Sequence, residues 1–234
     1  MKKEVQIKAN KLYEKKLHRK IIKIAFLLLI IIMSFIYLIL YILNENGGFT
    51  VSIDRNLYNR KSVYLSEDGT IENKTIKLTA ESIQNMDNIS IKWLPANIDT
   101  EKTGVHNGDN YIAYTFYVVN SGKETLNYWY EIDIDDKIRN VDEAIRIMII
   151  KNGKKIVYAK KNKETGFAEE NTKKFVSKSI AVLEQRKKFK PNEKDRYTIV
   201  VWIEGDDPDC KNDLLGGALK MHMDISEEHL KKKK

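Results

Sequence analysis

The chain has 234 residues and a formal net charge of +8, and that charge is concentrated at the two ends. Residues 1–23 hold nine basic and two acidic side chains and the chain closes on four lysines, so residues 24–230 carry a net charge of −3. A mildly acidic main segment excludes nucleic acid as a partner bound over a basic surface. The single cysteine, Cys210, excludes an internal disulfide, so the core alone must hold the fold together.

The first element that the sequence predicts is a membrane-spanning helix over residues 24–43. This stretch reads IAFLLLIIIMSFIYLILYIL, with no charge and with Ser34 as its one small polar residue. A run of about 20 such residues matches the thickness of a hydrocarbon layer, and a helix that is apolar all round needs lipid around it in a chain of this size. We expect side chains along the whole segment to anchor the protein in the lipid bilayer: Ile24, Leu28, Ile32, Phe35 and Leu43.

The charge of the flanking segments predicts the orientation of this helix. The basic tail, residues 1–23, is expected to stay in the cytoplasm, because lysine and arginine are retained on that side. A cleaved signal peptide is the alternative, but residues 40–46 contain no small-residue cleavage site. We therefore predict a single-pass protein of the cell membrane with an uncleaved anchor, a linker over residues 44–48, and an extracellular C-terminal domain.

Beyond the linker, alternation of apolar and polar residues predicts one β domain over residues 49–226, followed by a charged tail over residues 227–234. Two half-buried strands are expected at residues 75–80 and 88–94. Two longer apolar runs are expected to pair as a central hairpin around Asn120-Ser-Gly. These runs cover residues 111–119 and 126–134.

The clearest local signal is Asn152-Gly153, which lies between two β-prone runs and suits a tight type I′ hairpin turn. After a predicted surface loop (161–175), residues 176–183 suggest a strand, with a helix over 176–188 as the alternative. The last two predicted strands, 197–204 and 219–225, are joined by a short helical crossover with Asp207 as N-cap and Pro208 at its first position. About nine strands and almost no further helix predict a mainly β fold, an antiparallel β-sandwich or jelly-roll-like domain.

The segment WIEGDDPDCKNDLLGG, residues 202–217, is the most distinctive part of the sequence. Clustered acids in a loop offer the hard oxygen ligands that calcium prefers. The spacing is not that of an EF-hand, and the same acids suit the capping of backbone amides around the crossover. No cofactor is expected unless calcium binds here, and its candidate ligands are Glu204, Asp206, Asp207, Asp209 and Asp213.

Catalytic arrangements find little support in the sequence. Cys210 and His222 offer a thiol and a base, but no motif supplies a third, orienting group, and the acids around Cys210 disfavour a thiolate. No H-E-x-x-H motif is present. The many aromatic residues of the predicted strands suit either a sugar- or peptide-binding groove or, as we predict, packing in the sheet core. We expect the protein not to be an enzyme.

The order of these features resembles a known family. A basic start, one hydrophobic helix, the β-prone Gly48-Phe-Thr-Val-Ser-Ile and a strand closing on Val119-Asn-Ser-Gly are similar to camelysin and TasA-like exported proteins of Gram-positive bacteria. The segment around Trp-Ile-Glu-Gly-Asp-Asp-Pro-Asp-Cys also resembles a sequence segment of uncharacterised membrane-anchored proteins of Firmicutes. The resemblance implies a jelly-roll-like sandwich and, for the TasA branch, fibre assembly by strand exchange. The missing cleavage site departs from that branch.

These observations favour a membrane-anchored surface domain that serves in envelope structure or binds a protein partner, including further copies of itself. An accessory subunit of a bacterial membrane machine, such as a secretion or conjugation apparatus, is the alternative. An exported hydrolase comes third, and it would require a deep pocket with polar groups of shifted pKa.

Overall fold

The computed structural model describes residues 2–45, 49–83 and 85–227, and the chain divides into two compact units, residues 1–46 and 47–234. The first unit is one helix, α1 (Lys2–Glu45), which begins well before the predicted span because residues 2–23 contain neither proline nor glycine to stop it. Its stretch Lys15–Ile39 is long and apolar enough to cross a membrane, with a mean hydropathy of 2.8.

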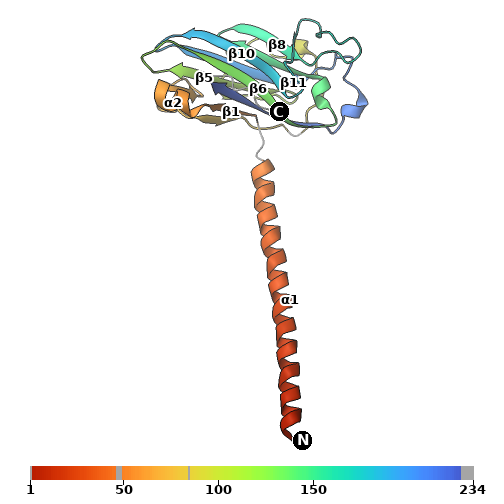
Figure 1. Ribbon diagram of the computed structural model, residues 1–234. Helices are drawn as coiled ribbons and strands as arrows, with labels where there is room; N and C mark the ends of the chain where they lie inside the picture. The colour runs from red at the N-terminus through yellow and green to blue at the C-terminus, as the bar shows by residue number, and fades with distance from the viewer. Residues whose placement is uncertain (1, 46–48, 84, 228–234) are drawn as a thin grey trace. The chain divides into compact units, whose positions relative to one another are not determined.

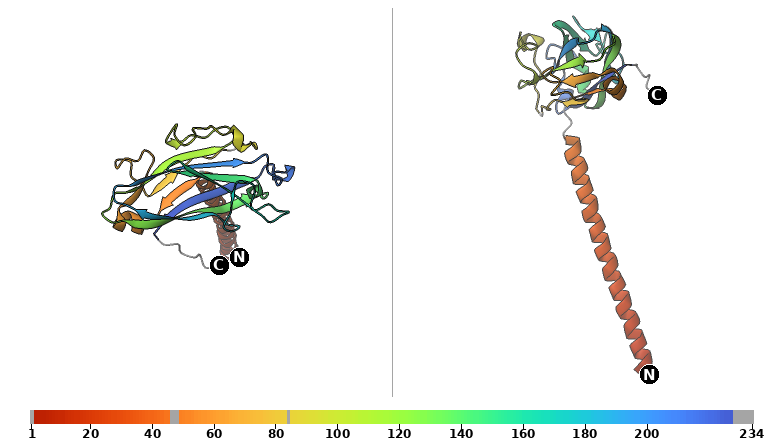
Figure 2. Two further views of the ribbon diagram at one scale, coloured as in Figure 1. Left: turned by 90° about the horizontal axis from the view of Figure 1, so that it is seen from above. Right: turned by 90° about the vertical axis from the view of Figure 1, so that its left-hand side faces the viewer.

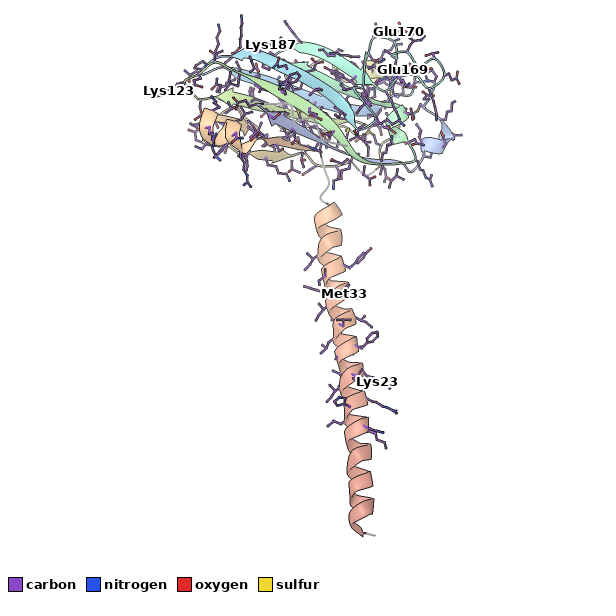
Figure 3. All side chains as sticks on the ribbon, viewed as in Figure 1. Lys23, Met33, Lys123, Glu169, Glu170 and Lys187 are labelled. Atoms are coloured by element: carbon purple, nitrogen blue, oxygen red, sulfur yellow. The ribbon has the colours of Figure 1, made fainter. Side chains whose placement is uncertain are left out.

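The side chains of residues 15–39 are all exposed, as a lipid-facing surface requires. Among the predicted anchor residues, Ile24, Leu28, Ile32 and Phe35 are each at least half exposed. The side chain of Leu43 lies outside the described residues. In Figure 3 the sequence from Lys23 to Met33 passes from charged to apolar side chains.

The second unit is built from two sheets, which Figures 1 and 2 show as two layers of strands. One sheet has the order β10-β6-β12-β1-β3, and the other has the order β2-β5-β11-β7-β8-β9 with β4 added beside β5. The strands of the first sheet are β1 (Thr50–Ile53), β3 (Lys77–Thr79), β6 (Leu126–Ile138), β10 (Ile180–Phe189) and β12 (Ala218–Ser226). Those of the second are β2 (Val63–Ser66), β4 (Gly104–Val105), β5 (Ile112–Asn120), β7 (Ile145–Lys151), β8 (Lys154–Ala159), β9 (Lys173–Lys174) and β11 (Lys194–Ile203).

The short helices connect these strands. They are α2 (Arg55–Lys61), whose first turn is capped by Asp54, and the 3-10 turns η1 (Ile91–Trp93), η2 (Val141–Glu143) and η3 (Asn212–Leu214). The predicted mainly β fold with one N-terminal apolar helix is confirmed. The pairing is mostly antiparallel, but β1 runs parallel to β12 and β9 runs parallel to β8.

The core lies between the sheets, where alternate residues of each strand interdigitate. Tyr197, Ile199 and Val201 of β11 point into this core, whereas Val200 and Trp202 point to the opposite face of the seven-stranded sheet. That opposite face is also covered, by Ile89, Ile98 and neighbours from the segment between β3 and β4. Coverage on both faces explains why β5, β7 and β11 carry apolar residues at most positions, on both faces of the strand.

The predicted central hairpin is wrong, because β5 and β6 belong to different sheets. Residues 121–125 carry the chain from one layer to the other. The Asn120 side chain fixes this crossing, since its Nδ2 donates to the carbonyl oxygens of Glu124 and Phe189 at 3.0 and 3.1 Å. The aromatic residues of both strands therefore meet in the core from opposite sides.

Two other predictions are corrected and two are confirmed, one of them in part. Residues 88–94 form one bridge, from Ile89 to Glu204, and then η1, because the Ser90 hydroxyl caps a turn there. Residues 207–217 contain turns and η3 in place of a helix starting at Pro208. The strand predicted over residues 176–183 is confirmed in part, since β10 covers residues 180–189, and the alternative helix is wrong. The predicted hairpin is confirmed, with Asn152 and Gly153 at φ 50° and 79° between β7 and β8.

Candidate functional site

The acidic segment predicted from the sequence meets a second loop at one end of the second unit. Asp207 and Asp209 follow β11, and Glu169 comes from the loop between β8 and β9. One carboxylate oxygen of each lies within 4.8 Å of the others, and both aspartates are buried. Glu169 and Glu170 are labelled on this loop in Figure 3, and Lys123 and Lys187 lie at the opposite end of the domain.

Most of this carboxylate cluster has partners within the protein. Asp207 forms a buried ion pair with Arg146 at 2.6 Å, and its Oδ1 accepts the backbone N–H of Asp209 at 2.7 Å. Asp209 Oδ2 accepts the backbone N–H of Lys163 at 2.9 Å. The two aspartates thus hold both loops together by accepting backbone N–H groups, the structural role that the sequence favours over metal binding.

The remaining predicted ligands lie elsewhere. Glu204 Oε2 accepts the indole N–H of Trp202 at 3.0 Å and the backbone N–H of Ile91 at 3.1 Å. Asp206 accepts the Ser90 hydroxyl at 2.8 Å, and Asp213 is exposed. The five predicted residues therefore do not converge on one point, and calcium binding stays a prediction.

Sequence reasoning missed Glu169 and Arg146. Glu169 Oε1 is out of contact with water and accepts no hydrogen bond from the described residues. The only sequence signal for it was the pair Glu169-Glu170 in a loop without periodicity. Arg146 had a clearer signal, because a charged residue inside the apolar run of β7 has to find a partner when it is buried.

Beside this cluster lies an open cleft of about 550 Å³. Its walls carry four acids against two bases, Glu169, Glu170, Glu204 and Asp206 against Lys92 and Arg146. The segments that border it also bear two aromatic side chains that are more exposed than any other large apolar side chain described, Phe167 at 76% and Trp93 at 73%. An acidic hollow with exposed aromatic side chains in the neighbouring segments offers both charge and apolar area to a cationic, partly apolar partner.

Other candidate sites have ordinary structural surroundings. Cys210 Sγ accepts Asn88 Nδ2 at 3.4 Å, whereas His222 is surrounded by aspartates of β6 and β12, so the structure does not bring this pair together among the described residues. Tyr114, Tyr128, Tyr197 and Trp202 are fully buried, as predicted for core aromatics.

A second cavity, of about 310 Å³, opens between the sheets. Phe49, Met86, Leu219 and further apolar side chains line it, and Ser82 supplies the one side-chain hydroxyl among its lining residues. Such walls suit apolar packing and supply no acid, base or nucleophile besides that hydroxyl.

No protein-family model matches the chain, and no curated protein matches it significantly. Among solved structures, the crystal structure of a β-glucosidase from Kluyveromyces marxianus in complex with glucose aligns with 76% of this chain and 17% of its own, at 10% identity and a TM-score of 0.24. A likeness of this size carries no argument about function.

Proposed function

We propose that this protein is a non-enzymatic, membrane-anchored surface protein whose β-sandwich binds a protein partner outside the cell. The observation that carries the proposal is the acidic cleft, together with the exposed side chains of Trp93 and Phe167 in the chain segments next to its lining residues. Exposed aromatic side chains are enriched at the centres of protein interfaces, where they contribute large apolar area at low entropic cost.

The membrane part of the proposal is supported by α1. The charge-free part of its exposed stretch, residues 24–39, suits a lipid environment, and the basic residues before it favour a cytoplasmic N-terminus. The sandwich then faces the outside, as in the camelysin and TasA-like proteins that the sequence resembles.

The cleft also defines the chemistry of the partner. Four acids against two bases attract a basic segment, and electrostatic attraction of this kind raises association rates and selects against acidic partners. Trp93 and Phe167 would pack against aliphatic parts of that segment or against its arginine side chains. A lysine- or arginine-containing loop or tail of another surface protein fits both features.

The experiment is crosslinking in intact cells, followed by solubilisation in mild detergent and mass spectrometry of the retained proteins. The double variant Trp93→Ala/Phe167→Ala and the double variant Glu169→Gln/Glu170→Gln are compared with the unmodified protein. An aromatic side chain that is a hot spot of an interface contributes about 2 kcal/mol to the binding free energy. Because the variant Trp93→Ala/Phe167→Ala removes two such side chains, we expect its recovery of the same partner to fall at least about 10-fold.

Matched controls lie away from the cleft. Lys123→Ala/Lys187→Ala alters charge at the opposite end of the domain, and Ile71→Ala removes an apolar side chain that is 55% exposed. Both should retain the partner. Equal recovery with all variants would contradict the cleft assignment. Ladders of the protein alone would favour self-association in envelope structure, and a fixed set of membrane proteins would favour the accessory-subunit alternative.

A further inference from the structure

The outer face of the five-stranded sheet carries a second group of polar side chains, none of which lines the cleft. Ile132 of β6 and Met223 of β12 point into the core, so their neighbours Asp133, His222 and Asp224 point outward. The strand register places His222 directly opposite Asp133, and Ser52 of β1 directly opposite Asp224. Three strands thus bring these side chains together in the middle of the sheet.

A β-bulge adds a fourth side chain to the group. The pairing of β12 with β6 shifts between Lys220 and Met221, which face Asp136 and Ile134, so Asp135 is the extra residue of β6. A bulge re-aims the side chain of its extra residue. Asp135 reaches the imidazole of His222 from the side opposite Asp133, with 2.7 Å between its Oδ1 and His222 Nδ1.

The two nitrogens of His222 are therefore in different situations. Nδ1 is within ordinary hydrogen-bond distance of Asp135. Nε2 lies 3.5 Å from Asp133 Oδ2 and 3.4 Å from Asp224 Oδ2, longer than a good N–H···O hydrogen bond to either. One nitrogen is held in place, and the other faces two carboxylates across a wider gap.

That gap has the dimensions of a zinc site. Two ligand atoms bound to a tetrahedral Zn²⁺ at about 2.0–2.1 Å lie roughly 3.3 Å apart. The measured separations of 3.4 and 3.5 Å agree with this spacing, and the ligand atoms of Asp133, His222 and Asp224 all lie within 4.8 Å of one another. A carboxylate on the second ring nitrogen is the usual outer partner of a zinc-bound histidine.

We propose that Asp133, His222 and Asp224 bind a divalent transition-metal ion of the zinc class, with Asp135 positioning the imidazole. Ser52 positions Asp224, because its hydroxyl donates to Asp224 Oδ1 and leaves Oδ2 directed toward His222. One nitrogen and two carboxylate oxygens suit Zn²⁺, whereas Ca²⁺ requires six to eight oxygens. Side-chain exposures of 25% for His222 and 44% for Asp224 leave a fourth position open to water.

The charge of the group is consistent with this assignment. Three aspartates, Asp133, Asp135 and Asp224, surround one imidazole. A divalent ion bound among them would balance two of the three carboxylate charges.

The test measures zinc binding to the full chain, purified in mild detergent without a polyhistidine tag. Isothermal titration with Zn²⁺ should give one site per chain, and Co²⁺ in its place should give the visible absorption of a tetrahedral nitrogen–oxygen site. An outer-shell partner contributes about 10–100-fold to metal affinity, so Asp135→Asn should weaken binding by about that factor and His222→Gln by more.

Controls separate this site from other ligands in the chain. Glu169→Gln alters the other carboxylate cluster and His106→Gln removes another histidine of the domain, and both variants should bind zinc as the unmodified protein does. Zinc should raise the melting temperature of the control variants and leave that of His222→Gln unchanged. This outcome would show that His222→Gln folds but lacks the site. Stoichiometric zinc binding that persists in His222→Gln, or its absence in the unmodified protein, would overturn the proposal.

Discussion

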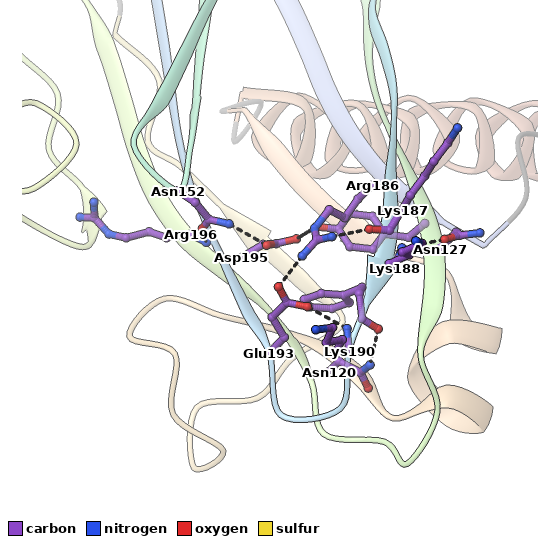
Figure 4. Close-up of polar contacts among 12 residues, drawn as sticks. Asn120, Asn127, Asn152, Arg186, Lys187, Lys188, Lys190, Glu193, Asp195 and Arg196 are labelled. Carbon is purple, nitrogen blue, oxygen red and sulfur yellow. Dashed lines mark hydrogen bonds and ion pairs between the residues drawn. The ribbon is translucent and has the colours of Figure 1, made fainter.

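At the scale of single residues, the Asp195 carboxylate joins the two sheets through buried hydrogen bonds. It is fully buried at the start of β11. Its Oδ2 accepts the Tyr128 hydroxyl at 2.6 Å and Arg186 Nε at 2.8 Å, both from the five-stranded sheet, and its Oδ1 accepts Asn152 Nδ2 at 2.7 Å. Figure 4 shows the contacts of Asp195 with Asn152 and Arg186, and Arg186 also reaches Glu193. Every oxygen of the buried carboxylate is thereby satisfied.

Replacing Asp195 with alanine should therefore destabilise the domain strongly. The change leaves Arg186, whose side chain is only 17% exposed, without its buried counter-ion, and removal of one partner of a buried pair costs about 3–5 kcal/mol. Urea unfolding of the full chain in detergent, followed by the fluorescence of the buried Trp202, measures the change.

The exposed Asp213 supplies the control for this prediction. Asp213→Ala should alter the free energy of unfolding by less than about 0.5 kcal/mol, as substitutions at open surface sites do. A loss below about 1 kcal/mol in Asp195→Ala would mean that the network contributes little to the contact between the sheets.

At the scale of elements, the β7–β8 hairpin depends on the backbone of its turn. Gly153 has φ +79°, and a Cβ added there would meet no atom within 4 Å, so the conformation alone sets the effect of a substitution. Gly153→Ala should cost about 1 kcal/mol in the free energy of unfolding. Gly153→Asn should cost less, because asparagine tolerates the left-handed region better. Equal losses in the two variants, measured by the same urea unfolding, would show that backbone strain is not the cause.

The same hairpin shows which elements can be predicted from sequence. Asn152-Gly153 determines its turn within four residues, so the prediction needed no knowledge of distant strands. The pairing of residues 111–119 with 126–134 failed because both runs are β-prone, and only contacts such as that of Asn120 with Phe189 decide that they join different sheets. The alternative helix over 176–188 had the same origin, since pairing with β6 makes that run a strand.

The candidate sites were predictable only in part for the same reason. Asp207 and Asp209 lie in a visible acidic run, but Glu169 reaches them through a loop whose path depends on tertiary contacts. His222 and Asp224 alternate along a predicted strand, whereas Asp133 lies in another and Asp135 follows directly after its predicted end. Their convergence depends on the register of β6 against β12 and on one bulge, and neither is encoded in a local pattern.

At the scale of the whole molecule, the orientation of the chain in the membrane can be tested with its single cysteine. If the β domain faces outward, a membrane-impermeant maleimide should label the partly exposed Cys210 in intact cells. To remove any effect of its partial burial, a Cys210→Ser/Asp213→Cys variant places the thiol at an exposed position of the same loop. Labelling of both before permeabilisation is the expected outcome, because the basic residues of 1–23 hold the N-terminus inside.

The matched reporter for the other side is Cys210→Ser/Lys16→Cys, whose thiol should react only after the cells are permeabilised. Replacing the basic residues nearest the apolar stretch with glutamine should invert a fraction of the molecules, because the difference in charge across the helix sets its orientation. The residues to replace are Lys15, Arg19, Lys20 and Lys23. When these basic residues are replaced, the cysteine at position 16 should become reactive in intact cells. The cysteine at position 213 should lose reactivity to the same extent. Labelling of Lys16→Cys before permeabilisation in the otherwise unchanged chain would reverse the orientation and place the acidic cleft in the cytoplasm.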